Sequence, residues 1–174
     1  MKQRIRVVGI IRSEDGILIL KRNLGRSDAP VFWELPTGKI KFGEQPEEAI
    51  VRSLEEYTGL KVSSVKIKDV ITFLALEDSS RMSNLYIIYD VNIVGDLKPV
   101  PRDRYVAYKF IKDFSSAGVR LNEASTSVFE IIEGRITSDR ISARDTASSV
   151  AIYVDGASRG NPGPAGTGYR SLSP

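Results

Sequence analysis

The sequence predicts an α/β or α+β fold in which a mixed sheet packs against two helices, and three observations support this prediction. Short runs rich in Val, Ile, Tyr and Phe recur along the first 110 residues, as expected for strands. Two longer segments, residues 46–58 and 122–133, place apolar side chains at helical spacing instead. The composition, with 41% hydrophobic and 27% charged residues, is that of a globular chain that can bury a core.

Turn signals separate the expected strands. Residues 5–11 and 17–20 flank the stretch Ser-Glu-Asp-Gly at positions 13–16, which predicts a hairpin. Further strands are expected, in chain order, at residues 32–35, 62–76, 85–94 and 105–110. Strands and helices combined in this way make a layered architecture around one core.

The two expected helices have recognisable ends. In the first, at residues 46–58, Pro46 suits the first turn and Gly59 can end the helix in a left-handed conformation. The second, at residues 122–133, carries an apolar face and is followed by Gly134. This second helix is expected to close the first domain.

The chain is expected to divide near residue 135. Residues 1–135 form the first domain in this interpretation. Residues 136–149, ITSDRISARDTASS, are polar and without periodicity, which is typical of a linker. An apolar strand is then expected at residues 150–154, so residues 150–174 are predicted to begin a second domain.

The composition limits the chemistry. The chain contains no cysteine and no histidine, which excludes disulfides, thiolate zinc sites, and catalysis by Ser-His or Cys-His pairs. Acid–base or metal chemistry must therefore use carboxylates, whose hard oxygen ligands favour Mg²⁺ or Mn²⁺. The net charge of +3 is compatible with phosphate-bearing ligands. Without a membrane-spanning apolar run or a secretion signal, a cytoplasmic protein with no membrane partner is expected.

Residues 35–60 read LPTGKIKFGEQPEEAIVRSLEEYTGL, and they carry the most specific motif of the chain. Gly38, Glu44, Arg52, Glu56 and Gly59 resemble the Nudix box in both identity and spacing. The resemblance covers residues 4–134 and implies an α/β/α sandwich with a mixed sheet. It also implies cleavage of nucleoside diphosphate derivatives by water, with glutamates of the box helix holding Mg²⁺ or Mn²⁺.

The resemblance assigns candidate roles residue by residue. Glu56, Glu44 and Arg52 are the catalytic candidates. Glu56 and Glu44, with the carbonyl group of Gly38, are candidate ligands of weakly bound Mg²⁺ or Mn²⁺. Gly38 and Trp33 are candidates for substrate binding, because an indole ring can stack on a base. Structural alternatives stay open: Arg52 and Glu56 suit a helix pair, Glu44 suits a loop hydrogen bond, and Trp33 suits core packing.

Two of the glutamates that the family pattern requires are replaced. The resemblance places main metal ligands at positions 53 and 57, where this sequence has Ser53 and Tyr57. Glu55 lies about 200° around the helix from both positions, so it cannot substitute for them. A degraded metal site with weak or no hydrolysis is therefore expected.

The tail YVDGASRGNPGPAGTGY, at residues 153–169, resembles the start of a type 1 ribonuclease H domain. That resemblance implies that Asp155 is the first of four metal-binding carboxylates, of which the other three are missing. Contact with an RNA–DNA hybrid is thus expected only through the missing remainder of a Nudix–ribonuclease H fusion. A flexible tail rich in Gly and Pro is the alternative.

Three functions stay open at this point. The first is an accessory module of such a fusion that binds a nucleotide or a nucleic-acid-related ligand. The second is an active Mg²⁺-dependent pyrophosphohydrolase of a nucleoside diphosphate derivative. The third is a structural or homodimerisation domain without a ligand.

Overall fold

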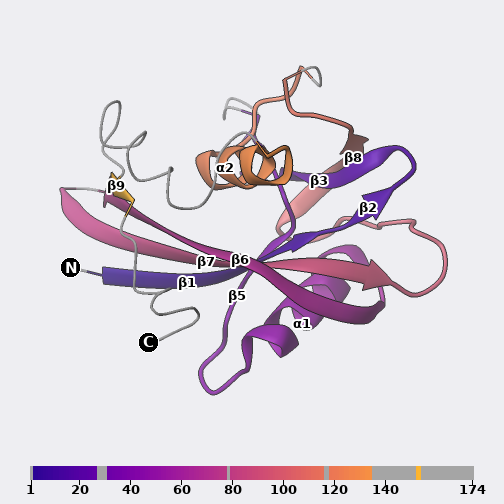
Figure 1. The fold of residues 1–174 in the computed structure, drawn as a ribbon, viewed down its shortest axis with the longest axis horizontal. Helices are drawn as coiled ribbons and strands as arrows, with labels where there is room; N and C mark the ends of the chain where they lie inside the picture. Colours follow the sequence, from indigo (N-terminus) through magenta and orange to yellow (C-terminus); the bar gives the residue numbers. More distant parts are fainter. Residues whose placement is uncertain (1, 27–30, 78, 116–117, 135–151, 154–174) are drawn as a thin grey trace. The chain divides into compact units, whose positions relative to one another are not determined.

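The computed structural model describes residues 2–26, 31–77, 79–115, 118–134 and 152–153 (Figure 1). The chain forms two compact units. The larger unit comprises Ile5–Asp69 and Ile87–Arg135. The described parts of the smaller unit lie within residues 2–4, 70–86 and 152–153. All of the Nudix-like motif residues belong to the larger unit.

The first sheet has the strand order β5-β1-β7-β6-β9. The bounds of these strands are Thr37–Lys39 for β5, Lys2–Ile10 for β1, Ser80–Ile93 for β7, Val62–Glu77 for β6 and Ile152–Tyr153 for β9. Strands β1 and β5 are antiparallel, with Val7 opposite Gly38. This pairing fixes the strand that leads into the box segment.

The second sheet contains the predicted hairpin. It consists of β2 (Arg12–Ser13), β3 (Gly16–Arg22), β4 (Trp33–Glu34) and β8 (Tyr105–Ile111), with β3 paired to β2, β4 and β8. Gly16 has a φ of +125°, and a Cβ atom there would collide with the backbone of Ile111. Only glycine fits this turn, because L side chains rarely adopt such a φ.

Helix α1 (Pro46–Thr58) coincides with the predicted box helix. The Gln45 N–H donates to a carboxylate oxygen of Glu48 at 3.3 Å, as in a capping box. At the other end, Gly59 has a φ of +70° and its N–H donates to the carbonyl of Glu55 at 3.0 Å. The inner face of the helix carries buried Ala49, Ile50 and Leu54.

The core of the larger unit lies between α1 and the strands. It is built from apolar side chains of β1, β3, β7, β8 and α1, among them Val7, Leu18, Leu20, Ile50, Leu54, Val91 and Tyr105. Helix α2 (Glu123–Ile132) buries Val128 and Phe129. In Figure 1, α2 lies above β1 and α1 lies below its inner end, as in the layered α/β/α arrangement that the Nudix resemblance implies.

A buried carboxylate connects these elements. Glu34 of β4 is 1% exposed. Its Oε1 accepts hydrogen bonds from Nη1 of Arg22 at 3.1 Å and from Nδ2 of Asn122 at 3.2 Å. Its Oε2 accepts from the hydroxyl of Tyr105 at 2.7 Å and lies 3.6 Å from Nε of Arg104. A buried charge persists only when it is paired and hydrogen-bonded, so these partners hold β4 to β3, β8 and the start of α2.

Tyr105 extends this connection to the box. Its hydroxyl accepts a hydrogen bond from the N–H of Thr37 at 3.2 Å while it donates to Glu34. Burial raises the pKa of the Tyr105 hydroxyl above its ordinary value, so the hydroxyl keeps its proton and remains a donor. The strand that carries Gly38 is thereby tied to the buried carboxylate.

The structure also differs from the predicted elements. Strand β5 was not predicted, and β7 begins at Ser80 instead of residue 85. The strand expected at residues 150–154 is present at Ile152–Tyr153, where it pairs antiparallel with β6. The predicted linker at 136–149 and the tail motif around Asp155 lie outside the described residues. Neither described helix is long and apolar enough to cross a membrane.

Tyr105→Phe is expected to destabilise the protein by about 1–3 kcal/mol, because it removes a hydrogen bond from a buried carboxylate and another from a buried N–H group. Chemical denaturation monitored by circular dichroism measures this change. Tyr108→Phe is the matched control on the same strand, since Tyr108 is 42% exposed. A Tyr105→Phe variant as stable as the control would show that the connection to Glu34 does not support the fold.

Candidate functional site

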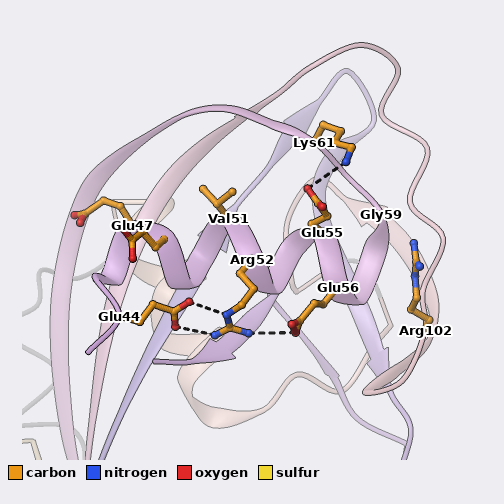
Figure 2. A pocket seen from close by; sticks show the side chains of 10 residues that line it. Glu44, Glu47, Val51, Arg52, Glu55, Glu56, Gly59, Lys61 and Arg102 are labelled. Atoms are coloured by element: carbon orange, nitrogen blue, oxygen red, sulfur yellow. Dashed lines mark hydrogen bonds and ion pairs between the residues drawn. The ribbon is translucent and has the colours of Figure 1, made fainter. Parts of the chain in front are cut away.

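The box residues border an open groove along the outer face of α1. The groove has a volume of about 940 Å³. Figure 2 shows how its side chains project from this helix face and from the segments that flank the end of the helix. The lining residues are Glu44, Glu47, Glu48, Val51, Arg52, Glu55, Glu56, Gly59, Lys61 and Arg102. All of them belong to the larger unit.

Arg52 occupies the centre of this site. Its Nε and Nη2 donate to the two carboxylate oxygens of Glu44 at 2.7 and 2.9 Å. Its Nη1 donates to Oε2 of Glu56 at 3.1 Å, the i,i+4 pair expected from the sequence. Nη2 also donates to the carbonyl of Lys39 at 2.7 Å. The guanidinium therefore joins the β5–α1 loop to the helix and stands between two carboxylates (Figure 2).

Both carboxylate oxygens of Glu44 accept hydrogen bonds. Oε1 accepts a second hydrogen bond, from the N–H of Lys41 at 2.9 Å. The hydrogen bonds from Arg52 and then from the Lys41 N–H lower the pKa of Glu44 from an ordinary 4.5 to about 2. The same contact with Glu44 raises the pKa of Arg52. Both members of this pair stay charged at neutral pH.

Other acids of the groove have partners as well. Glu55 pairs with Nζ of Lys61 at 3.3 Å, and Glu47 accepts a hydrogen bond from the hydroxyl of Tyr89 at 2.9 Å. Burial, followed by the contact with Glu47, raises the pKa of Tyr89 above its ordinary value. Glu55 thus lines the groove and forms a surface ion pair.

Positions 53 and 57 face the interior. Ser53 is 3% exposed, and a Cβ atom at Gly38 would collide with its hydroxyl oxygen. The ring of Tyr57 meets the ring of Tyr105 edge-on, with centroids 5.7 Å apart and an interplanar angle of 86°. Both side chains border an enclosed space with no room for a water molecule. Within the described residues, the Ser53 hydroxyl has no hydrogen-bond partner.

The oxygen donors of this site decide which metal centre it can hold. Mg²⁺ and Mn²⁺ require several converging oxygen ligands. Across the part of the chain that the structure describes, no group of three or more acidic side chains could hold a metal ion. Glu44 is fully engaged, and the cation between Glu44 and Glu56 is the guanidinium of Arg52. These residues do not fit a multinuclear metal centre.

The structure brings together only some of the predicted site residues. Glu44, Arg52 and Glu56 form one network, while Gly38 lies behind the helix beside Ser53. Trp33 is not among the groove residues, and its ring lies 5.2 Å from Nζ of Lys109.

Sequence reasoning missed Glu34 as the centre of the buried network. The available signal was a single carboxylate inside the apolar run Phe-Trp-Glu-Leu at positions 32–35. A charge in such a run has to find partners when it is buried.

A family model described as NUDIX domain matches residues 2–122. The chain belongs to the Nudix family. Among curated Nudix relatives, an RNA pyrophosphohydrolase of Saccharophagus degradans is 44% identical over 64 residues, which are 36% of each chain. An 8-oxo-dGTP diphosphatase of Escherichia coli is 40% identical over 60 residues, 34% of this chain and 46% of the relative. The chain thus matches less than half the length of these two relatives.

Solved Nudix structures share the fold. A MutT Nudix hydrolase from Burkholderia pseudomallei has a TM-score of 0.60 at 20% identity and covers 75% of this chain and 98% of its own. The ORF135 protein of Escherichia coli has a TM-score of 0.60 at 21% identity, over 83% and 94% of the two chains. These likenesses confirm the Nudix fold predicted from the box.

The Glu44–Arg52 contact predicts a distinct acid titration. Because the folded-state pKa of Glu44 is lowered, the stability that its ionised form contributes is present above the ordinary pKa of 4.5 and is lost as the pH falls toward about 2. Carboxyl carbon NMR is expected to show a Glu44 midpoint near 2 in the native protein. In Arg52→Met the midpoint is expected to return toward the ordinary value. A midpoint unchanged by this substitution would contradict the assigned cause.

Proposed function

We propose that this Nudix domain binds a nucleotide or another nucleoside diphosphate derivative and cleaves it slowly or not at all. The observation that carries the proposal is the position of Arg52. Its guanidinium pairs with both Glu44 and Glu56, the two box carboxylates proposed as ligands of a divalent ion. Family membership and the names of the two curated relatives support nucleotide derivatives as the ligand class.

A guanidinium cannot replace the chemistry of the metal. Divalent ions polarise phosphoryl oxygens and lower the pKa of a bound water, which provides several kcal/mol of transition-state stabilisation. Arg52 neutralises the carboxylates but has no open coordination position for water. With Ser53 buried and Tyr57 partly buried against Tyr105, no further box carboxylate is available on that side of the helix.

The groove is still suited to a ligand. Its volume of about 940 Å³ lies within the range of small-molecule sites, roughly 300–1,000 Å³. Its five carboxylates exceed its three cationic side chains, so a free phosphate chain is repelled along most of its length. A nucleotide is therefore expected to enter with its own Mg²⁺ or Mn²⁺ bound to the phosphates.

An active pyrophosphohydrolase is the second candidate function, and the curated relatives favour it. That function would need Glu56 together with an acid from another element. The accessory role beside a ribonuclease H domain rests on the tail motif alone and remains a prediction.

Hydrolysis is expected to be slow or undetectable. We expect turnover below about 1 per second, the lower end of ordinary enzymatic rates. The assay measures phosphate or pyrophosphate release from 8-oxo-dGTP and 5′-triphosphorylated RNA, and AMP release from ADP-ribose, with Mg²⁺ or Mn²⁺. The Escherichia coli 8-oxo-dGTP diphosphatase is the positive control for the first substrate. Turnover at 1 per second or faster would refute the proposal in favour of an active hydrolase.

Arg52→Met is expected to bind Mn²⁺ more tightly than the native protein, because it releases two carboxylates from the same guanidinium. A gain of roughly tenfold in affinity corresponds to about 1.4 kcal/mol. Titration followed by electron paramagnetic resonance measures free Mn²⁺, and a thermal melt confirms that the variant is folded. Glu55→Gln is the control, since Glu55 pairs with Lys61 instead. Equal or weaker Mn²⁺ binding by Arg52→Met would show that the guanidinium does not block a metal.

A further inference from the structure

Arg102 differs from the other cations of the groove. Arg52 is held by two glutamates, and Lys61 pairs with Glu55. Arg102 lines the same groove and is exposed, yet among the described residues it has no ion pair. The glutamates nearest the end of the helix are thus engaged by other cations. The guanidinium of Arg102 is available to an anion from solution.

The backbone of Arg102 is fixed to the last turn of α1. Its N–H donates to the carbonyl of Tyr57 at 3.0 Å, and its carbonyl accepts from the N–H of Tyr105 at 3.2 Å. Two residues earlier, the N–H of Val100 donates to the carbonyl of Thr58 at 2.8 Å. These bonds satisfy helix-end carbonyls with backbone donors, so the side chain of Arg102 is not needed as a cap.

Gly59 makes room for the guanidinium. A Cβ atom at Gly59 would lie 2.7 Å from Nη2 of Arg102, closer than such atoms approach. Figure 2 shows Arg102 beside Gly59 at one end of the groove and Glu47 toward the other end. The side chain is therefore anchored at its base, seated over a residue without a side chain, and open to the groove.

We propose that Arg102 binds a phosphate group of the ligand and orients a nucleotide with its phosphates toward the Gly59 end of the groove. This inference rests on the proposed function. A guanidinium presents planar, paired N–H donors that match two phosphate oxygens, and such charge-assisted contacts are stronger than neutral ones. Glu47 and Glu48 at the opposite end repel phosphate, so the charge distribution of the groove favours one direction of binding.

Isothermal titration with three probes tests the proposal: GDP, inorganic pyrophosphate and guanosine, each in the presence of Mg²⁺. Arg102→Gln is expected to weaken binding of GDP and pyrophosphate by about tenfold or more and to leave guanosine binding unchanged. Arg102→Lys keeps the charge without the planar donors and is expected to give an intermediate loss. Lys98→Gln is the control, with a change of less than about twofold expected because Lys98 does not line the groove and pairs with exposed Asp96.

The outcomes separate this inference from the proposed function. If GDP binds the native protein and Arg102→Gln binds it equally well, the inference is overturned and the proposed function stands. If neither GDP nor pyrophosphate binds the native protein, both fail. If Arg102→Gln loses affinity for pyrophosphate and for GDP by the same factor, the contact between Arg102 and phosphate is supported. If the native protein binds GDP more tightly than pyrophosphate, the phosphate belongs to a nucleotide. A thermal melt of each variant shows whether a loss of affinity reflects unfolding, in which case the Arg102→Lys result decides.

Discussion

The carboxylate of Glu34 lies in the interior of the larger unit, where an unpaired charge would cost several kcal/mol. Arg22, Tyr105 and Asn122 satisfy it from three different elements. Tyr105 in turn holds Thr37, the residue before Gly38, and packs against the box helix. The strand and the helix that carry the box are therefore positioned by a carboxylate that lies outside it.

Charge compensation also organises the surface of α1. Glu44 and Glu56 approach each other because Arg52 compensates both charges, and the backbone of Lys39 and Lys41 adds further hydrogen bonds. In this chain the conformation of the β5–α1 loop is thus maintained by an internal cation.

The sequence predicted the elements with strong local signals and missed those that depend on distant partners. Helix α1 was predicted with the correct bounds because Pro46 and Gly59 mark its ends. Strand β5 was missed because Thr-Gly-Lys has no strand pattern, and its existence depends on pairing with β1. The network around Glu34 could not be predicted, since its partners lie 12 to 88 residues away in the chain. The box motif indicated Glu44, Arg52 and Glu56 together, and their spacing indicated the Arg52–Glu56 helix pair, but not the contact between Arg52 and Glu44.

Gly38 is required in the box for a steric reason. Any side chain at this position would push β5 away from α1 at Ser53, and Gly59 is limited by its left-handed conformation. In this chain, the glycines of the motif are required by the fit of strand, helix and loop, independently of catalysis. A motif search that depends on Gly38 and Gly59 therefore detects the backbone geometry of the box. Turnover has to be judged from the carboxylates, because those side chains can be replaced while the geometry persists.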